Sequence, residues 1–83
     1  MNREEKLEEL KKKAQVFFEK STFVFVKAIK SNGGYELRNG PITEVSADFF
    51  MLQDVQDNKP IPIFFLELLP EGSIFEPSRR ERW

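Results

Sequence analysis

Apolar residues near the start of the chain recur every three to four positions, at Leu7, Leu10, Ala14, Phe17 and Phe18. On a helix with about 3.6 residues per turn, these positions form one apolar stripe. Asn2 is a favourable N-cap residue, and Glu5 three positions later completes a capping-box pattern. The pattern therefore predicts an amphipathic helix within residues 1–21.

After residue 21 the chain changes to short runs of β-branched and aromatic residues that end at turn-forming residues. Such runs predict strands rather than helices. The predicted strand segments are Thr22–Lys30, Tyr35–Arg38, Ile42–Val45, Phe49–Val55, Ile61–Leu66 and Ser73–Glu76. A short helical turn or a loop is expected at Glu67–Gly72, and residues 77–83 are expected to form a flexible tail.

The segment Asn39-Gly40-Pro41 leaves two interpretations open. Asn-Gly between two strand-like runs is typical of a tight hairpin. Alternatively, one long strand bends at Gly40 and places Pro41 at a bulge or an unpaired edge. The local pattern alone favours the hairpin.

Pro60 and Pro62 lie two residues apart at the start of a predicted strand. Neither has a backbone N–H, and residues two apart in a strand face the same neighbour. One edge of this strand is therefore expected to pair poorly. With the two segments that flank Gly40 counted as one strand, five short strands in about 55 residues are expected to curl into a small barrel, which limits exposed edges.

The composition excludes several classes of function. The chain has 83 residues, 13 Lys and Arg, 14 Asp and Glu, and neither Cys nor His. Thiolate chemistry, disulfides and histidine-based catalysis or metal binding are therefore excluded. The carboxylates form no recognisable catalytic pair, and no Gly-rich phosphate loop is present. We expect a cytoplasmic protein that is not an enzyme, with no catalytic residues, no metal, no cofactor and no membrane contact.

The stretch from Gly40 to Leu52 (GPITEVSADFFML) resembles the second and third strands of the first Sm motif. That motif runs from a glycine through an aliphatic residue and a turn to an apolar strand. A helix followed by five strongly bent strands is also similar to the Sm-like family, including bacterial Hfq. The resemblance implies a mainly β fold: an N-terminal helix (1–21) packed on a five-stranded antiparallel Sm-like, or SH3-like, barrel (22–76). It also implies that the long second strand bends at Gly40.

Membership of this family would imply a homo-oligomeric ring of about five to seven subunits. Neighbouring subunits would meet through their fourth and fifth strands. The predicted interface residues are Ile61, Ile63, Phe64, Phe65, Ile74 and Phe75. Small domains without disulfides or metals often gain stability by such assembly.

The resemblance also implies that single-stranded RNA binds around the pore. Asp48 lies in the turn that would line the pore, and Phe49 beside it is the best candidate for base stacking. However, Phe49-Phe50 stands where the family carries Met-Asn, and Leu66-Glu67 stands where it carries Arg-Gly or Lys-His.

Basic residues outside the turn are further candidates for phosphate contacts. They are Lys27, Lys30 and Arg38 on the first strands and Arg79 and Arg80 in the tail. The ordinary interpretation of such residues is a solvated face and a solubilising tail. Ring symmetry would strengthen a weak basic patch by repeating it.

Two functions follow as hypotheses. The first is an Sm-like ring that binds single-stranded RNA as a chaperone or scaffold. The alternative is an oligomeric protein-interaction module of the same fold with no RNA role. The absence of both base-reading motifs favours the alternative.

Overall fold

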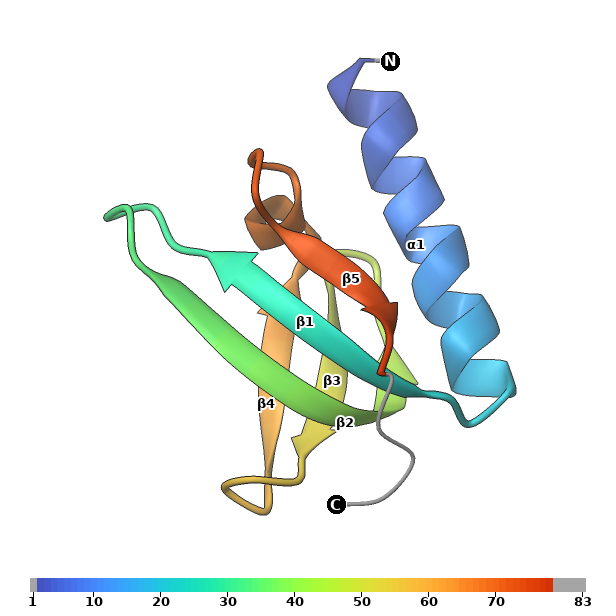
Figure 1. The fold of residues 1–83 in the computed structure, drawn as a ribbon. Helices are drawn as coiled ribbons and strands as arrows, with labels where there is room; N and C mark the ends of the chain where they lie inside the picture. The colour runs from blue at the N-terminus through green and yellow to red at the C-terminus, as the bar shows by residue number, and fades with distance from the viewer. Residues whose placement is uncertain (1, 79–83) are drawn as a thin grey trace.

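The computed structural model describes residues 2–78 and begins with one amphipathic helix, α1 (Arg3–Glu19) (Figure 1). Asn2 caps it, because the Glu5 N–H donates to the Asn2 side-chain oxygen at 2.9 Å. The apolar stripe directs Leu10 and Ala14 into the core. The predicted N-terminal helix is confirmed.

Five strands follow α1 and form one antiparallel sheet in the order β4-β3-β2-β1-β5 (Figure 1). The predicted order of one helix and a five-stranded antiparallel sheet is therefore confirmed. The edge strands β4 and β5 do not pair with each other, so the sheet is open and a closed barrel is not confirmed. The elements after α1 are β1 (Phe23–Ile29), β2 (Tyr35–Val45), β3 (Phe49–Asp54), β4 (Lys59–Phe64), the 3-10 helix η1 (Phe65–Leu68) and β5 (Ile74–Pro77).

The segment around Gly40 is continuous strand, so the hairpin interpretation of Asn39-Gly40 is wrong. The first half of β2 pairs with β1, with Gly40 opposite Val24, and the second half pairs with β3. A register shift between Ile42 and Glu44 marks a bulge. Asn39-Gly40 does not form a turn, because the runs on both sides of it belong to one strand that pairs with both β1 and β3.

Gly40 also lies where two backbones approach closely. A Cβ atom at this position would overlap the carbonyl oxygen of Gln53 on β3. The neighbouring Asn39 C=O accepts a hydrogen bond from the Val55 N–H at 3.0 Å. β2 therefore passes directly against β3 here, and only a residue without a side chain fits.

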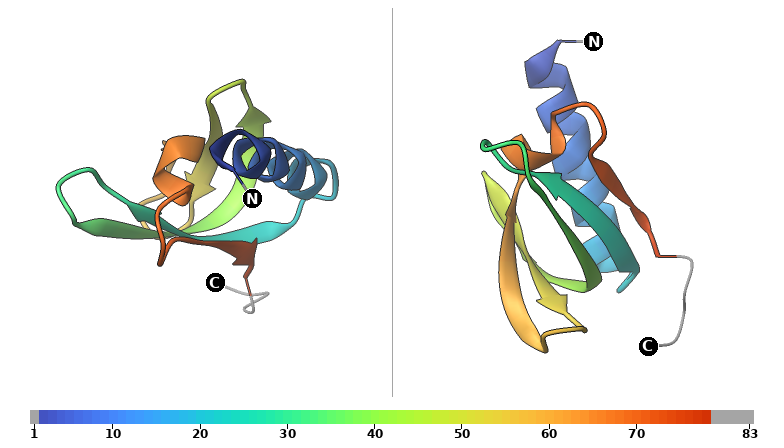
Figure 2. Two further views of the ribbon diagram at one scale, coloured as in Figure 1. Left: turned by 90° about the horizontal axis from the view of Figure 1, so that it is seen from above. Right: turned by 60° about the vertical axis from the view of Figure 1, so that its left-hand side comes forward.

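The bent sheet curls around a core that α1 and η1 cover (Figure 2). Alternate residues of β1 and β3 point into it, as the period of two in a strand requires. The buried apolar residues are Leu10, Ala14, Val24, Val26, Ala28, Ile42, Phe50, Leu52, Ile63, Phe65, Leu68 and Phe75.

In each pair of adjacent phenylalanines, in β3 and at the β4–η1 junction, one ring lies in the core and the other lies outside it. Phe50 and Phe65 are fully buried, and Phe50 stacks on Phe75 with ring centroids 5.0 Å apart. Phe49 and Phe64 instead pair with each other outside the core, at 5.4 Å. One ring of each pair thus fills the core, as expected from strand alternation.

The C-terminal boundary differs from the expected tail at residues 77–83. Pro77 belongs to β5, and the Ser78 N–H donates to the Phe23 carbonyl oxygen at 2.9 Å. The remainder of the predicted tail, residues 79–83, lies outside the described residues.

Gly40→Ala should destabilise the chain by about 3 kcal/mol or more, because the methyl group would force β2 and β3 apart. Urea unfolding measures this difference. Gly33→Ala is the matched control, since a Cβ at Gly33 meets no atom within 4 Å. That control should cost only about 1 kcal/mol of backbone strain. Equal losses in the two variants would contradict the close approach.

Candidate functional site

The three strand cations among those predicted for phosphate contact do not form one stripe. Arg38 lies opposite Val26, a core residue, so its side chain starts on the concave side of the sheet. Lys30 follows the same alternation at the end of β1 and reaches η1. Lys27 lies on the opposite, convex side, where its Nζ sits 4.7 Å from the centre of the Tyr35 ring.

Lys30 and Arg38 are already paired with carboxylates. The Lys30 Nζ lies 2.6 Å from Glu67 and 3.3 Å from Glu36. Arg38 lies 2.8 Å from Glu36 and 2.8 Å from Asp57. Together with Asp54, these residues form a continuous set of contacts, here called the ion-pair chain: Lys30, Glu36, Arg38, Asp54, Asp57 and Glu67.

The ion-pair chain contains two cations and four carboxylates, so it presents a net negative charge. Hydrogen bonding to Arg38 holds the pKa of Glu36 below its usual value. The hydrogen bond to Glu67 raises the pKa of Lys30, and the one to Glu36 raises that of Arg38. A phosphate would have to displace these carboxylates to bind here.

Asp54 is the buried anchor of the ion-pair chain, with only 1% of its surface exposed. It accepts hydrogen bonds from the Asp57 N–H at 2.8 Å and the Asn39 N–H at 3.5 Å, and it lies 3.4 Å from Arg38. These contacts tie the β3–β4 turn to β2. Sequence reasoning missed this role, although Asp54 occupies the same alternate positions of β3 as the buried Phe50 and Leu52.

The predicted base-stacking site at Asp48 and Phe49 is only partly formed. Asp48 is exposed and lines a cavity of about 170 Å³ between α1 and the β4–η1 junction. Phe49 is half-buried, packs against Phe64 and is not among the lining residues. The cavity is lined by Leu7, Lys11, Ala47, Asp48, Phe64, Phe65 and Leu66. None of the three predicted strand cations belongs to it, and Arg79 and Arg80 lie outside the described residues.

The six residues predicted for the subunit interface separate into a buried group and a group with exposed surface, and only the second group can contact a partner. Ile63, Phe65 and Phe75 are buried in the chain's own core, so their side chains have no surface to offer a partner. Ile61 and Ile74 are half-buried, and Phe64 is exposed.

The open edge of β4 lacks backbone donors. The Phe65 N–H points toward β3, where it donates to Asp48, and the Phe64 N–H points away, to the Glu67 side chain. Because hydrogen-bonding directions alternate along an antiparallel strand, residues 60 and 62 also face the open edge. Both are prolines. The outward-facing positions of β4 therefore offer carbonyl oxygens but no free N–H.

The open edge of β5 is almost as poor in donors. Ser78 donates to Phe23 of β1, so Ile74 and Glu76 also face β1 by the same alternation. Phe75 and Pro77 then face outward, and proline has no N–H. Within β4 and β5, Phe75 is thus the one outward-facing residue with an available backbone donor. A ring built by pairing these two edges would form an incomplete ladder.

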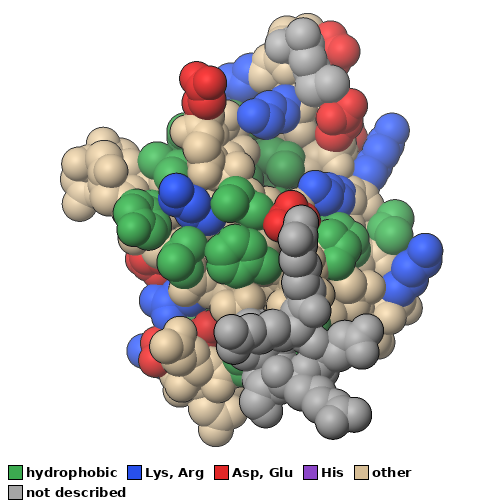
Figure 3. Space-filling view, in the orientation of Figure 1, with side chains coloured by type: hydrophobic (Ala, Val, Ile, Leu, Met, Phe, Trp, Pro, Cys, Tyr) green, Lys and Arg blue, Asp and Glu red, His purple; other side chains and the backbone are tan. Residues whose placement is uncertain are grey.

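The convex side of β5, β1 and β2 is a more continuous candidate surface, here called the outer face. Hydrophobic side chains gather across this side of the molecule (Figure 3). Tyr35 is 59% exposed and Leu37 is 48% exposed. The outer face consists of Phe23, Phe25, Lys27 and Ile29 on β1, Tyr35, Leu37, Asn39 and Pro41 on β2, and Ile74 and Glu76 on β5.

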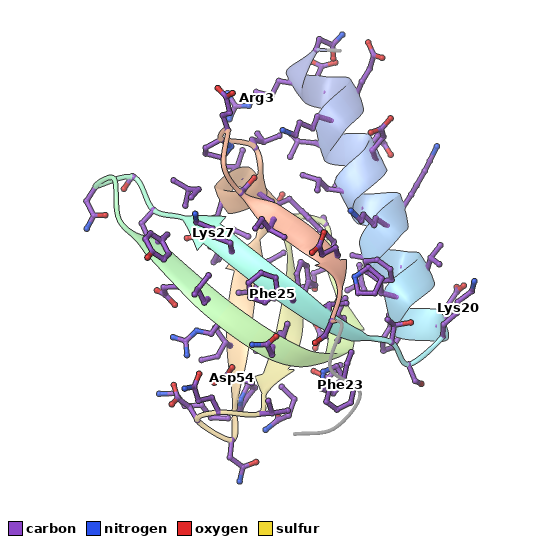
Figure 4. All side chains as sticks on the ribbon, in the orientation of Figure 1. Arg3, Lys20, Phe23, Phe25, Lys27 and Asp54 are labelled. Atoms are coloured by element: carbon purple, nitrogen blue, oxygen red, sulfur yellow. The ribbon has the colours of Figure 1, made fainter. Side chains whose placement is uncertain are left out.

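The outer face follows from strand alternation. Val24, Val26 and Ala28 point into the core, so the residues between them point out. Phe25 and Lys27 therefore lie side by side on the convex surface of β1 (Figure 4). The cross-strand register adds Leu37 and Ile74 beside Lys27.

The described residues hold no group of three or more Asp or Glu side chains arranged to bind a metal, and no described helix is long and apolar enough to span a bilayer. Comparison of the chain with protein-family models, with curated proteins and with solved structures gave no match. The candidate site therefore stands on its own geometry.

The lowered pKa of Glu36 predicts a loss of stability in acid. Its folded pKa lies below the ordinary 4.5, so its ion pairs stabilise the fold above that pH and are lost as pH falls through the folded value. Urea unfolding between about pH 7 and pH 3 should show Glu36→Gln as less stable than the wild type near neutrality, with the two converging in acid.

Glu71→Gln is the control for this pH series, because Glu71 is exposed and forms no ion pair within residues 2–78. Its curve should follow the wild type at every pH. A deficit of Glu36→Gln that stays constant across the range would show that the ion pairs do not account for it.

Proposed function

We propose that this chain is a non-catalytic protein-interaction module whose outer face binds the surface of a protein. The observation that carries this proposal is the continuous apolar and aromatic character of a sheet face that the core does not use. Three of its residues are aromatic: Phe23, Phe25 and Tyr35. Contiguous exposed apolar surface on a small domain marks an interaction site more often than chance.

The composition of the outer face fits a protein partner. Protein interfaces are enriched in aromatic residues and poor in charges at their centre. The outer face carries one cation, Lys27, one carboxylate, Glu76, and one amide, Asn39, among seven apolar or aromatic side chains. Surfaces that stack nucleic-acid bases usually add several cations that follow the phosphate backbone. With one carboxylate for its one cation, the outer face supports a protein partner better.

The ion-pair chain supports the same conclusion. Lys30 and Arg38 are two of the cations that the sequence predicts for phosphate contacts. Both are paired with carboxylates. Their charges hold η1 and the β3–β4 turn to the sheet. They therefore serve the fold, which leaves little cationic surface on the strands for RNA.

A Sm-like ring that binds single-stranded RNA is the second candidate function. It is favoured by the strand order, because β4 and β5 lie at the two sheet edges that the resemblance uses for ring contacts. The cavity beside Asp48 also has a cation, Lys11, in its lining. The shortage of N–H donors at both edges weighs against this candidate.

A photo-crosslinking amino acid at position 37 tests the protein-interaction function in cells. We expect discrete protein adducts, because Leu37 projects from the middle of the outer face. The matched control places the same group at position 16, since Val16 on α1 is similarly exposed at 44% but lies off the outer face. Position 16 should give no comparable adduct.

Nuclease treatment separates the two candidate functions. Adducts from position 37 that survive nuclease support a protein partner. Adducts that nuclease removes, together with salt-dependent filter binding of oligo-U or oligo-A by the purified chain, would overturn the proposal in favour of RNA binding. The absence of any adduct specific to position 37 would also contradict it.

A further inference from the structure

The outer face carries two charged side chains that form no ion pair with any residue that the structure describes. Lys27 contacts the Tyr35 ring but forms no ion pair within residues 2–78, and neither does Glu76. The other cations of β1 and of the first half of β2, Lys30 at the end of β1 and Arg38, are paired with carboxylates. Lys27 and Glu76 therefore differ from these paired cations, and they lie amid the apolar residues of the outer face.

The register places these two charges on neighbouring strands. Lys27 lies opposite Ile74, and Glu76 lies opposite Phe25, which precedes Lys27 by two residues on β1. Such diagonal neighbours are separated by roughly 7–8 Å between their backbones. The cation and the anion thus occupy distinct positions on the same face, with apolar side chains around them.

We propose that the outer face docks on the outer face of a second copy of this chain, with Lys27 of each copy paired to Glu76 of the other. This rests on the proposed protein-interaction function and names its partner. The two stacked sheets are related by a twofold axis that lies in the plane between them. The axis passes midway between Lys27 and Glu76, perpendicular to the line that joins them. It therefore brings each lysine opposite the other copy's glutamate. The single axis forms both pairs at once, as an isologous interface requires.

Charge complementarity favours a second copy over an unrelated protein. The outer face supplies one positive and one negative group at different positions, so it is complementary to itself after a twofold rotation. The apolar residues around this pair would then bury against their own equivalents, as the inner faces of two stacked sheets do about 10 Å apart.

The sheet edges leave the outer face as the better route to self-assembly. Pro60, Pro62 and Pro77 remove outward-facing donors from β4 and β5, and Glu67 occupies the Phe64 N–H. Edge pairing between copies is therefore poor, whereas face-to-face packing needs no backbone donors. A dimer would also enlarge the buried apolar surface of a small domain.

Charge reversal tests the pairing directly by sedimentation velocity over a wide range of concentrations. The wild type should dimerise. Lys27→Glu places two carboxylates opposite each other at both pairs, and Glu76→Lys places two cations there. Each single variant should raise the dimer dissociation constant about tenfold or more.

Mixing the two single variants gives a result that only the proposed pairing explains. In the mixed dimer, Glu at position 27 faces Lys at position 76, and the original Lys27 faces the original Glu76. The mixture should therefore form heterodimers of near wild-type affinity, and the double variant should recover homodimers. Both positions are on the surface, and unchanged thermal unfolding of each variant at low concentration confirms that it is folded.

The outcomes separate this inference from the proposed function. A wild-type chain that stays monomeric at every concentration, or a dimer unaffected by either reversal, overturns the second-copy inference. Protein adducts at position 37 with a different partner would then leave the proposed function standing. A wild-type mass of five to seven subunits would instead support the Sm-like ring and overturn the face-to-face dimer.

Discussion

The close approach of β2 to β3 at Gly40 is the constraint on which the rest of the structure depends. β2 pairs with β1 along its first half and with β3 along its second, and the two partnerships meet at this residue. The Gln53 carbonyl leaves no room for a Cβ, and because Gly40 has none, β2 can pass against β3 there and bend the sheet. The bend creates a concave side that holds the core and a convex side that no other described element covers.

The concave side shows how the open sheet is held together. Rings from β3, η1 and β5 meet in the core, where Phe50 contacts both Phe65 and Phe75. Beyond that apolar centre, the ion-pair chain connects β1 and β2 to η1 and to the β3–β4 turn. Lys30 and Arg38, which the sequence predicts as phosphate-contacting cations, thus form tertiary ion pairs instead.

The features that sequence analysis predicted well are local. The helix followed from its apolar stripe and from the Asn2 cap, and the strands followed from β-branched and aromatic runs. The hairpin at Asn39-Gly40 was wrong because a strong local turn signal competed with a tertiary contact to Gln53, which is remote in the sequence. A glycine needed for close approach and a glycine needed for a turn look the same in a single sequence.

The site was harder to predict because it depends on register and on distant partners. Glu67 lies far along the chain from Lys30, and Asp57 far from Arg38, so their pairing could not be inferred from spacing. The alternation of Phe23 and Phe25 with Val24 and Val26 is the signal in the sequence that could have indicated a two-sided strand. The addition of Leu37, Ile74 and Glu76 to one surface required the observed pairing of β1 with both β2 and β5.

Packing of the outer faces of two copies is tested most directly by the concentration dependence of the side-chain methyl signals in the NMR spectrum of the wild-type chain. Because the outer face would be buried in the dimer, the methyl signals of Leu37 and Ile74 should shift as the protein concentration rises. The signals of Leu66, beside the cavity near Asp48, and of Ile61, on β4, should remain constant. Shifts at Leu66 or Ile61 with unchanged signals from Leu37 and Ile74 would contradict it.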